Sequence, residues 1–145
     1  MKAEQFLGTW QLRRCYEERD GVVTVPHKLG EGANGCIHYL PDGRMAVLIQ
    51  YGGCPRLPTG LAQATDAELA AVSRRFFAYG GTYSFDEDRV IHHLDICSNP
   101  NDVGADYVRA VQFSGNFLTL STPPEIREGQ AVTLKLEWES MAPRA

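Results

Sequence analysis

The first clear pattern in the chain is an alternation of apolar and polar positions that begins after Gly8. One face of this segment carries every second residue: Trp10, Leu12, Arg14 and Tyr16. A period of two residues is typical of a half-buried β-strand. The Asp20-Gly21 pair that follows is a common hairpin turn sequence. The pattern therefore predicts a long first strand that ends in a hairpin.

Similar alternating segments, separated by turn residues, predict further strands along the rest of the chain. The predicted strands cover 22–25, 36–40, 44–51, 82–86, 89–96, 107–113, 117–122 and 131–139. Pro41-Asp42-Gly43 is a tight connection between two of them. Many short strands joined in sequence indicate an all-β, antiparallel up-and-down barrel of about eight to ten strands, because closure removes exposed sheet edges.

One segment departs from this alternation and predicts a single helix. Thr65 and Glu68 have the spacing of a capping box, in which each side chain satisfies a backbone amide of the other residue. Apolar residues then recur at helical spacing, at Leu69, Val72 and Phe76. We therefore expect one helix over roughly 66–78, preceded by a glycine- and proline-rich loop.

Side-chain parity predicts which polar groups face the inside of the barrel. Within 89–96 the even positions are apolar except for His92, so His92 is expected inside and His93 outside. Within 107–113 the better-packed face carries Arg109 inward. For 36–40 we favour the face with Tyr39, and the alternative face with Cys36 and His38 stays open. The same argument gives the other polar or amphipathic side chains expected inside: Arg14, Tyr16, Tyr51, Tyr83 and Trp138.

Composition places these strands in one ordinary domain, covering 1–145. The 145 residues are 43% hydrophobic and 22% charged, with a formal net charge of −4. No basic run exceeds two residues, which argues against a nucleic-acid partner. We expect neither a membrane span nor a signal peptide, and hence a cytoplasmic protein. The four cysteines form no C-x-x-C pair and are expected to be free thiols.

The order of short motifs resembles that of a known family. A Gly8-Thr9-Trp10 opening is followed by the Asp42–Met45 hairpin, Tyr79–Tyr83, Val90–His93, Ser98-Asn99-Pro100 and Val108-Arg109. In order and spacing these are similar to the small bacterial and fungal lipocalin-like proteins of the calycin group. The resemblance covers nearly the whole chain and implies a lipocalin-like barrel. It says less about activity, because a shared fold does not fix function.

A barrel of this size encloses core side chains or one small ligand. The inward arginines are informative, since a buried guanidinium is costly unless it meets a carboxylate, a carbonyl or an anionic ligand. The resemblance implies that one arginine stacks on Trp10 at the closed end, so either Arg14 or Arg109 is open to a structural role. His92 is open both to a role as a hydrogen-bonded core histidine and to one in proton transfer.

Metal and cofactor chemistry find little support in the sequence. His92 and His93 point to opposite faces and cannot both hold a zinc ion. Haem-binding relatives of this barrel place an axial histidine near the C-terminus, and the C-terminal strand has none. Nucleophilic catalysis has weak support, because Cys36 shares a face only with His38 and the other cysteines lie opposite the inward residues or in a loop. We therefore expect no metal and no cofactor.

Two functions from different classes remain. The first is binding of a small hydrophobic molecule, aromatic or carbonyl-bearing, in the cavity, with Phe76, Phe77 or the 52–60 loop closing the mouth. The second is a cofactor-free isomerase, cyclase or lyase that uses general acid–base catalysis; such barrels are among those the resemblance points to. A homodimer is left open. The candidate catalytic residues are His92, Arg109 and Tyr83, and the candidate ligand-binding residues are Arg14, Tyr16, Tyr39, Tyr51 and Trp138.

Overall fold

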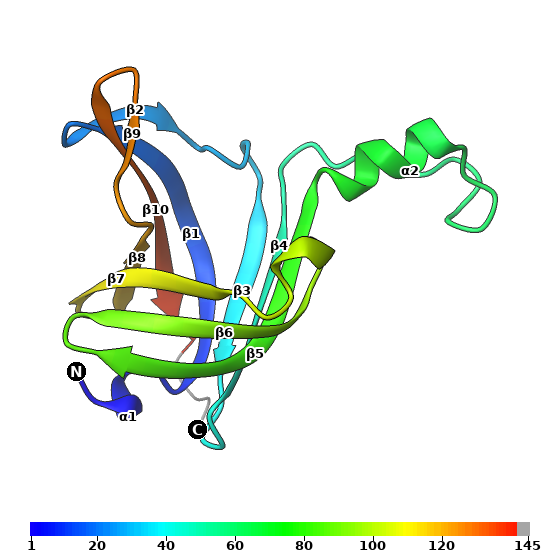
Figure 1. Ribbon diagram of the computed structural model, residues 1–145. Coiled ribbons are helices and arrows are strands. Elements are labelled where there is room, and N and C mark those ends of the chain that lie inside the picture. Colours follow the sequence, from blue (N-terminus) through cyan, green and yellow to red (C-terminus); the bar gives the residue numbers. More distant parts are fainter. Residues whose placement is uncertain (142–145) are drawn as a thin grey trace.

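A computed structural model describes residues 1–141 as a twisted sheet of ten strands that curls around a central space (Figure 1). The strands are β1 (Gly8–Arg19), β2 (Val22–Pro26), β3 (Asn34–Tyr39), β4 (Arg44–Gln50), β5 (Phe76–Asp86), β6 (Arg89–Cys97), β7 (Asp106–Ser114), β8 (Phe117–Ser121), β9 (Glu125–Arg127) and β10 (Gln130–Ser140). The helices are α1 (Ala3–Phe6), α2 (Asp66–Ser73) and a short 3-10 helix, η1 (Pro100–Asp102).

The sheet closes on itself through β1. The strand order is β2-β1-β3-β4-β5-β6-β7-β8-β10-β9, and β1 also pairs with β10, so eight antiparallel strands form a barrel while β2 and β9 extend outside it. This confirms the predicted lipocalin-like barrel. The short strand β9 was not among the strands predicted from the sequence. Asp20 and Gly21 join β1 to β2 with φ angles of 49° and 81°, as a hairpin turn of the mirror-image type requires.

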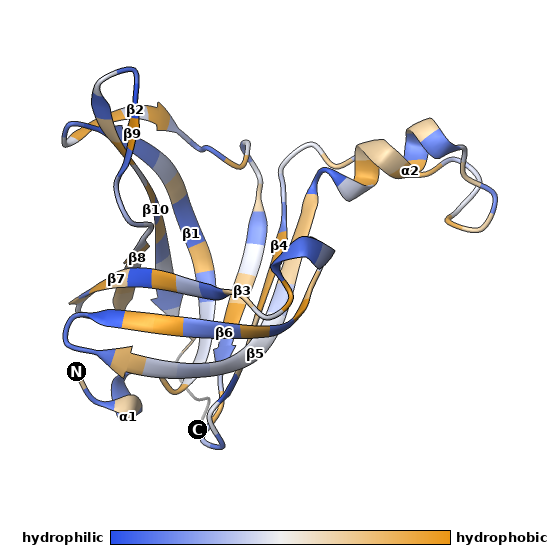
Figure 2. Ribbon diagram, in the orientation of Figure 1, coloured by the Kyte–Doolittle hydropathy of each residue, from blue (hydrophilic) through white to orange (hydrophobic). Residues whose placement is uncertain are grey.

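The two ends of the barrel differ. At one end lies the short helix α1, which was not predicted (Figure 1). Its residue Phe6 is fully buried and packs among aromatic rings of the barrel. The indole nitrogen of Trp10 donates a 2.8 Å hydrogen bond to the Phe6 carbonyl, which holds α1 against this closed end of the barrel. At the other end lie α2 and the β2 and β9 strands. Figure 2 shows the hydrophilic and hydrophobic bands that alternate along the barrel strands.

The predicted helix is shorter than expected. The capping box is present, with the Glu68 amide donating to Thr65 Oγ1 at 3.2 Å, but α2 ends at Ser73 and buries no residue. Phe76 and Phe77 begin β5 instead of closing the mouth from a helix. They pair with Gln50 and Ile49 of β4, so sheet pairing overrides the helical spacing of the apolar residues.

Two irregularities change the parity that the sequence suggests. The register of β1 against β10 shifts between Leu12 and Arg14, and beyond this bulge Cys15 is buried inside. The inward orientation predicted for Arg14 and Tyr16 is therefore wrong. In β6 the extra residue opposite the Gly80–Gly81 step turns Ile96 out, where it is 65% exposed.

Candidate functional site

The half of the barrel that lies away from α1 holds a cavity of about 250 Å³ that opens to solvent. Its wall is mainly aliphatic and aromatic, with contributions from β3, β4, β5, β7, β8 and β10. An apolar cavity of about 150 Å³ is enough to hold benzene, so this one has room for a substituted aromatic ring. The lining residues that carry a polar group are Tyr51, Tyr79, Tyr107, Arg109, Thr122 and Trp138.

Below the cavity, His92 lies between two tyrosine hydroxyls. Its Nε2 is 2.7 Å from the Tyr39 hydroxyl and its Nδ1 is 2.9 Å from the Tyr79 hydroxyl. His92 and Tyr39 are both fully buried and lie outside the cavity wall, whereas Tyr79 is part of that wall. The imidazole thus connects Tyr39, which packs against Phe6 at the closed end, to Tyr79 in the cavity wall.

Burial keeps this imidazole neutral. Desolvation, followed by the positive charge of Arg109, lowers the pKa of His92 from 6.5 to about 3. Desolvation also raises the pKa of Tyr39 and of Tyr79 above the ordinary value for tyrosine. At neutral pH the Tyr39–His92–Tyr79 group therefore carries no charge and has three hydrogens to share, one on each hydroxyl and one on the ring.

Arg109 supplies the single positive charge in the cavity wall. Its Nη1 donates to the Val108 carbonyl at 2.9 Å, and its guanidinium lies 5.0 Å from the ring centre of Tyr107. No carboxylate in the described part of the chain lies within ion-pair distance of it. The stacking on Trp10 that the resemblance implied does not occur for either arginine, because Arg14 stacks on Tyr16 on the outer face.

Trp138 forms part of the same wall and is almost completely buried, with 1% of its surface exposed. Its indole Nε1 is the one buried side-chain nitrogen or oxygen in residues 1–141 that has no hydrogen-bond partner. Buried indole N–H groups ordinarily find an acceptor, and leaving one unpaired is unfavourable.

The structure therefore brings only some of the predicted residues together. Tyr51, Arg109 and Trp138 line the cavity, and Tyr39 and His92 lie directly beneath it. Tyr83 is near the closed end, where its hydroxyl donates to the Leu40 carbonyl at 2.9 Å. Whether any of these residues binds a ligand or acts in catalysis stays a prediction.

The other two predicted residues lie away from the cavity. Arg14 and Tyr16 are on the outer face of β1, where both side chains approach Glu137. The bulge in β1 is the physical reason, since it shifts the parity of every residue after it.

Tyr79 is a cavity residue that the sequence reasoning missed, as Tyr107 and Thr122 also were not among the candidate site residues. It was lost because the segment before Gly80 was assigned to a helix and a turn. A signal was available: aromatic residues occupy alternate positions in this segment, at Phe77, Tyr79, Tyr83 and Phe85. With Gly81 completing the series, these positions form the inward face of one continuous strand, β5.

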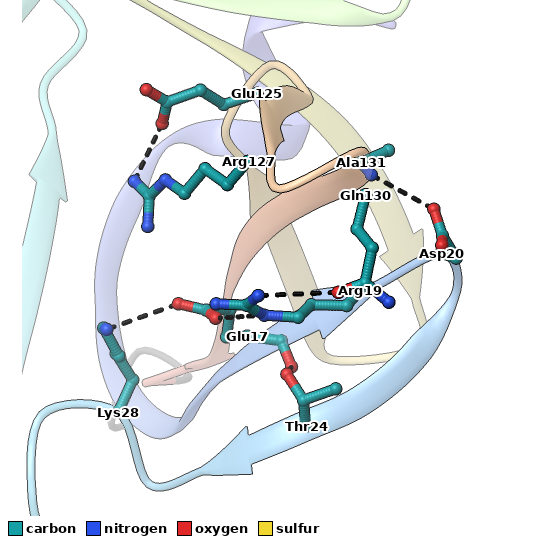
Figure 3. Close-up of polar contacts among 9 residues, drawn as sticks. All are labelled: Glu17, Arg19, Asp20, Thr24, Lys28, Glu125, Arg127, Gln130 and Ala131. Carbon is teal, nitrogen blue, oxygen red and sulfur yellow. Dashed lines mark hydrogen bonds and ion pairs between the residues drawn. The ribbon is translucent and has the colours of Figure 1, made fainter.

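Near the open end, a second polar group surrounds the buried carboxylate of Glu17. Arg19 and Lys28 contact its two oxygens at 3.2 and 3.3 Å (Figure 3). Desolvation acts to raise the pKa of Glu17, but the hydrogen bonds from these two cations outweigh it and the pKa is lowered. Arg127 and Glu125 form another ion pair beside this group (Figure 3).

A third polar group lies on the outer face of the barrel. Ser84 Oγ is 2.8 Å from His93 Nε2, and His93 Nδ1 is 2.7 Å from Asp106 Oδ1. The order of atoms is that of a serine, histidine and aspartate triad. The group sits on the surface of the sheet, however, and none of its three residues lines the cavity inside the barrel. It offers a substrate no enclosure.

Two general features complete the description of residues 1–141. No group of three histidine, cysteine, aspartate or glutamate side chains in this range is arranged to hold a metal ion. None of the helices described here has the length and apolar character needed to cross a membrane.

Comparison with known proteins gives a consistent result. Residues 7–141 match the lipocalin-like domain family. A curated protein from Aspergillus oryzae (strain ATCC 42149 / RIB 40), named as a 4'-hydroxy-3'-methoxypropiophenone carrier protein, is 36% identical over 66 residues. The aligned part covers 40% of this chain and 60% of that relative, so the similarity spans well under the whole length of either protein.

Proposed function

This chain belongs to the lipocalin-like domain family, and from that premise we propose that it is a carrier of a small aromatic, carbonyl-bearing molecule. The observation that carries the proposal is the cavity of about 250 Å³, open at one end and walled by aromatic and aliphatic side chains. Such a wall with a few polar groups is typical of small-molecule sites. The name of the Aspergillus relative, a carrier for an aryl ketone, supports the same class of ligand.

Acid–base catalysis is the less favoured function. It requires His92 to exchange a proton with a ligand, but His92 is fully buried and reaches the cavity only through the Tyr79 hydroxyl. With a pKa lowered to about 3, its neutral imidazole is a weak base at neutral pH. These two facts favour transport or storage of a ligand over its conversion. Cytoplasmic localisation stays a prediction.

The proposal is tested by calorimetric titration with propiophenone, a simple aryl ketone. We expect saturable binding of one molecule per chain. Leu134→Trp should fill the cavity and weaken binding by about tenfold or more, since Leu134 lies in the wall. Thr133→Trp is the matched control, because this neighbour on β10 faces the opposite way. The proposal fails if the wild-type protein binds no aryl ketone, or if the two variants weaken binding equally.

A further inference from the structure

The cavity wall offers hydrogen-bond donors without matching acceptors. The clearest case is Trp138, which lines the cavity and whose buried indole N–H has no acceptor among the described residues. An indole N–H can only donate. A ligand that fills this unmet requirement must therefore present an acceptor atom to Trp138.

Tyr79 is a second donor, because of how hydrogens are distributed around His92. The neutral imidazole has one N–H and one acceptor nitrogen, so it donates to one tyrosine and accepts from the other. Tyr39 is fully buried and has no other hydrogen-bond partner in the described residues, so its hydroxyl hydrogen must go to His92 Nε2. The ring then donates from Nδ1 to Tyr79, which leaves the Tyr79 hydroxyl hydrogen without an acceptor among the described residues. Because Tyr79 lines the cavity, a ligand there can accept this hydrogen.

Arg109 adds a positive charge that the protein does not balance. The one buried carboxylate among the described residues, that of Glu17, is compensated by two cations (Figure 3). The cavity is the reverse case, since its wall contains one guanidinium and no acidic residue. Arg109 also lies close enough to Tyr79 and His92 to influence both electrostatically. A cation next to apolar walls favours a negatively charged partner.

We propose that the ligand is bound as an oxyanion, the conjugate base of an aromatic acid, with its charged end accepting hydrogen bonds from Trp138 and Tyr79 and facing Arg109. The inference rests on the proposed function and specifies its ligand. Two kinds of compound share this chemistry: an aromatic carboxylate, and a phenol made acidic by a conjugated ketone. In both, the aromatic ring packs against the apolar wall while the charged end meets the three donors.

Matched ligand pairs distinguish an anion from a neutral ligand. For the phenol, the probes are 4′-hydroxypropiophenone and its 4′-methoxy ether, which cannot ionise. For the carboxylate, they are 4-ethylbenzoate and its methyl ester. We expect at least one acid to bind about tenfold more tightly than its neutral partner, as charge-assisted hydrogen bonds are stronger than neutral ones. The pair that shows this preference identifies the kind of oxyanion.

For the phenol, absorbance gives a direct readout, because the phenolate absorbs at longer wavelength than the neutral form. At a pH below the ligand's own pKa, binding should bring out the phenolate band. Arg109→Met should remove that band and the preference for the acid. Arg13→Met is the control, since Arg13 is paired with Glu139 on the outer face and its loss should change neither. Trp138→Phe keeps most of the ring and should weaken acid binding about threefold to tenfold.

The wild-type measurements alone can overturn the inference. If both neutral partners bind as tightly as the acids and the bound phenol keeps its neutral spectrum, the ligand is not held as an anion, although the carrier function stands. An undiminished phenolate band in Arg109→Met would equally contradict it. If none of the four compounds nor propiophenone binds, the proposed function itself fails and the inference fails with it.

Discussion

His92 and His93 are consecutive residues of β6 with the same side chain, and each imidazole lies between two hydrogen-bonding partners from other strands. His92 is enclosed by Tyr39 and Tyr79 inside the barrel, whereas His93 lies between Ser84 and Asp106 on its outer face. The distances on the two faces are similar, from 2.7 to 2.9 Å.

The difference lies in the surroundings. Inside, burial makes His92 depend on its two partners, so the imidazole is held neutral and fixes the direction of the Tyr79 hydroxyl. Outside, water can replace any partner, so the triad-like order of Ser84, His93 and Asp106 has little energetic or chemical consequence. A set of hydrogen bonds becomes a site only when the fold encloses it.

The largest test of this contrast is loss of the inner imidazole. In His92→Leu the hydroxyls of Tyr39 and Tyr79 both lose a partner while they stay buried. We expect the free energy of unfolding to fall by about 4 kcal/mol, measured by urea denaturation. The matched change on the outer face, His93→Leu, should cost about 0.5 kcal/mol or less. Equal losses in the two variants would contradict the distinction.

A somewhat smaller effect should follow from disturbing the pairing of β5 with β6, the strand that carries both histidines. A Cβ at Gly81 would lie 1.8 Å from the His93 carbonyl oxygen, so Gly81→Ala must push β5 and β6 apart. We expect a loss of about 3 kcal/mol by the same assay. Gly80→Ala is the control, because its nearest neighbour is 3.3 Å away. If Gly81→Ala were tolerated as well as Gly80→Ala, the close approach of the two strands would be in doubt.

The third test uses acid. The pKa of His92 is lowered from 6.5 to about 3, so below pH 6.5 the unfolded chain takes up a proton that the folded protein does not. Stability contributed by this group is therefore complete above pH 6.5 and is lost as the pH falls toward about 3, by about 1.4 kcal/mol per pH unit.

His92→Gln, compared with wild type at each pH, isolates this slope, because the carboxylates titrate in both proteins. The stability difference between the two proteins should shrink steadily as the pH falls below 6.5. A constant difference across that range would mean that His92 is not held neutral by burial.

The smallest effect is expected on the outer face. Ser84→Ala removes one member of the triad-like group without opening the core. Stability should change by about 0.5 kcal/mol or less, and the affinity for aryl ketones should stay the same. Hydrolysis of p-nitrophenyl acetate should be no slower than in wild type. A clear drop in ester hydrolysis would show instead that the exposed group is a working triad.

Much of the fold followed from the sequence because its signals are local. Alternation predicted most strands, the Asp20-Gly21 pair predicted a hairpin, and a capping box marked the start of α2. The inward orientation of His92, Arg109 and Trp138 also followed, since each lies on a strand whose parity runs undisturbed as far as that residue.

The failures share one physical cause, which is that a strand's register depends on its partners. Nothing in the local pattern around Arg13 announces a bulge, so Arg14 and Tyr16 were placed on the wrong face. In isolation, the spacing of Leu69, Val72 and Phe76 fits a helix. Phe76 belongs to β5 instead because it pairs with Gln50 of β4. Local patterns cannot weigh these longer-range contacts.

The sequence by itself determined that this chain is a barrel with a polar histidine and an arginine on its inner face, because side-chain parity is a property of each strand alone. Only the tertiary structure decided which groups meet among residues 1–141. It placed the Tyr79 hydroxyl within hydrogen-bond distance of His92, placed no carboxylate of this range beside Arg109, and left the Trp138 N–H without an acceptor. Those facts depend on which strands meet across the interior, and hydrogen-bond pairing there is set by distances between residues far apart in the chain.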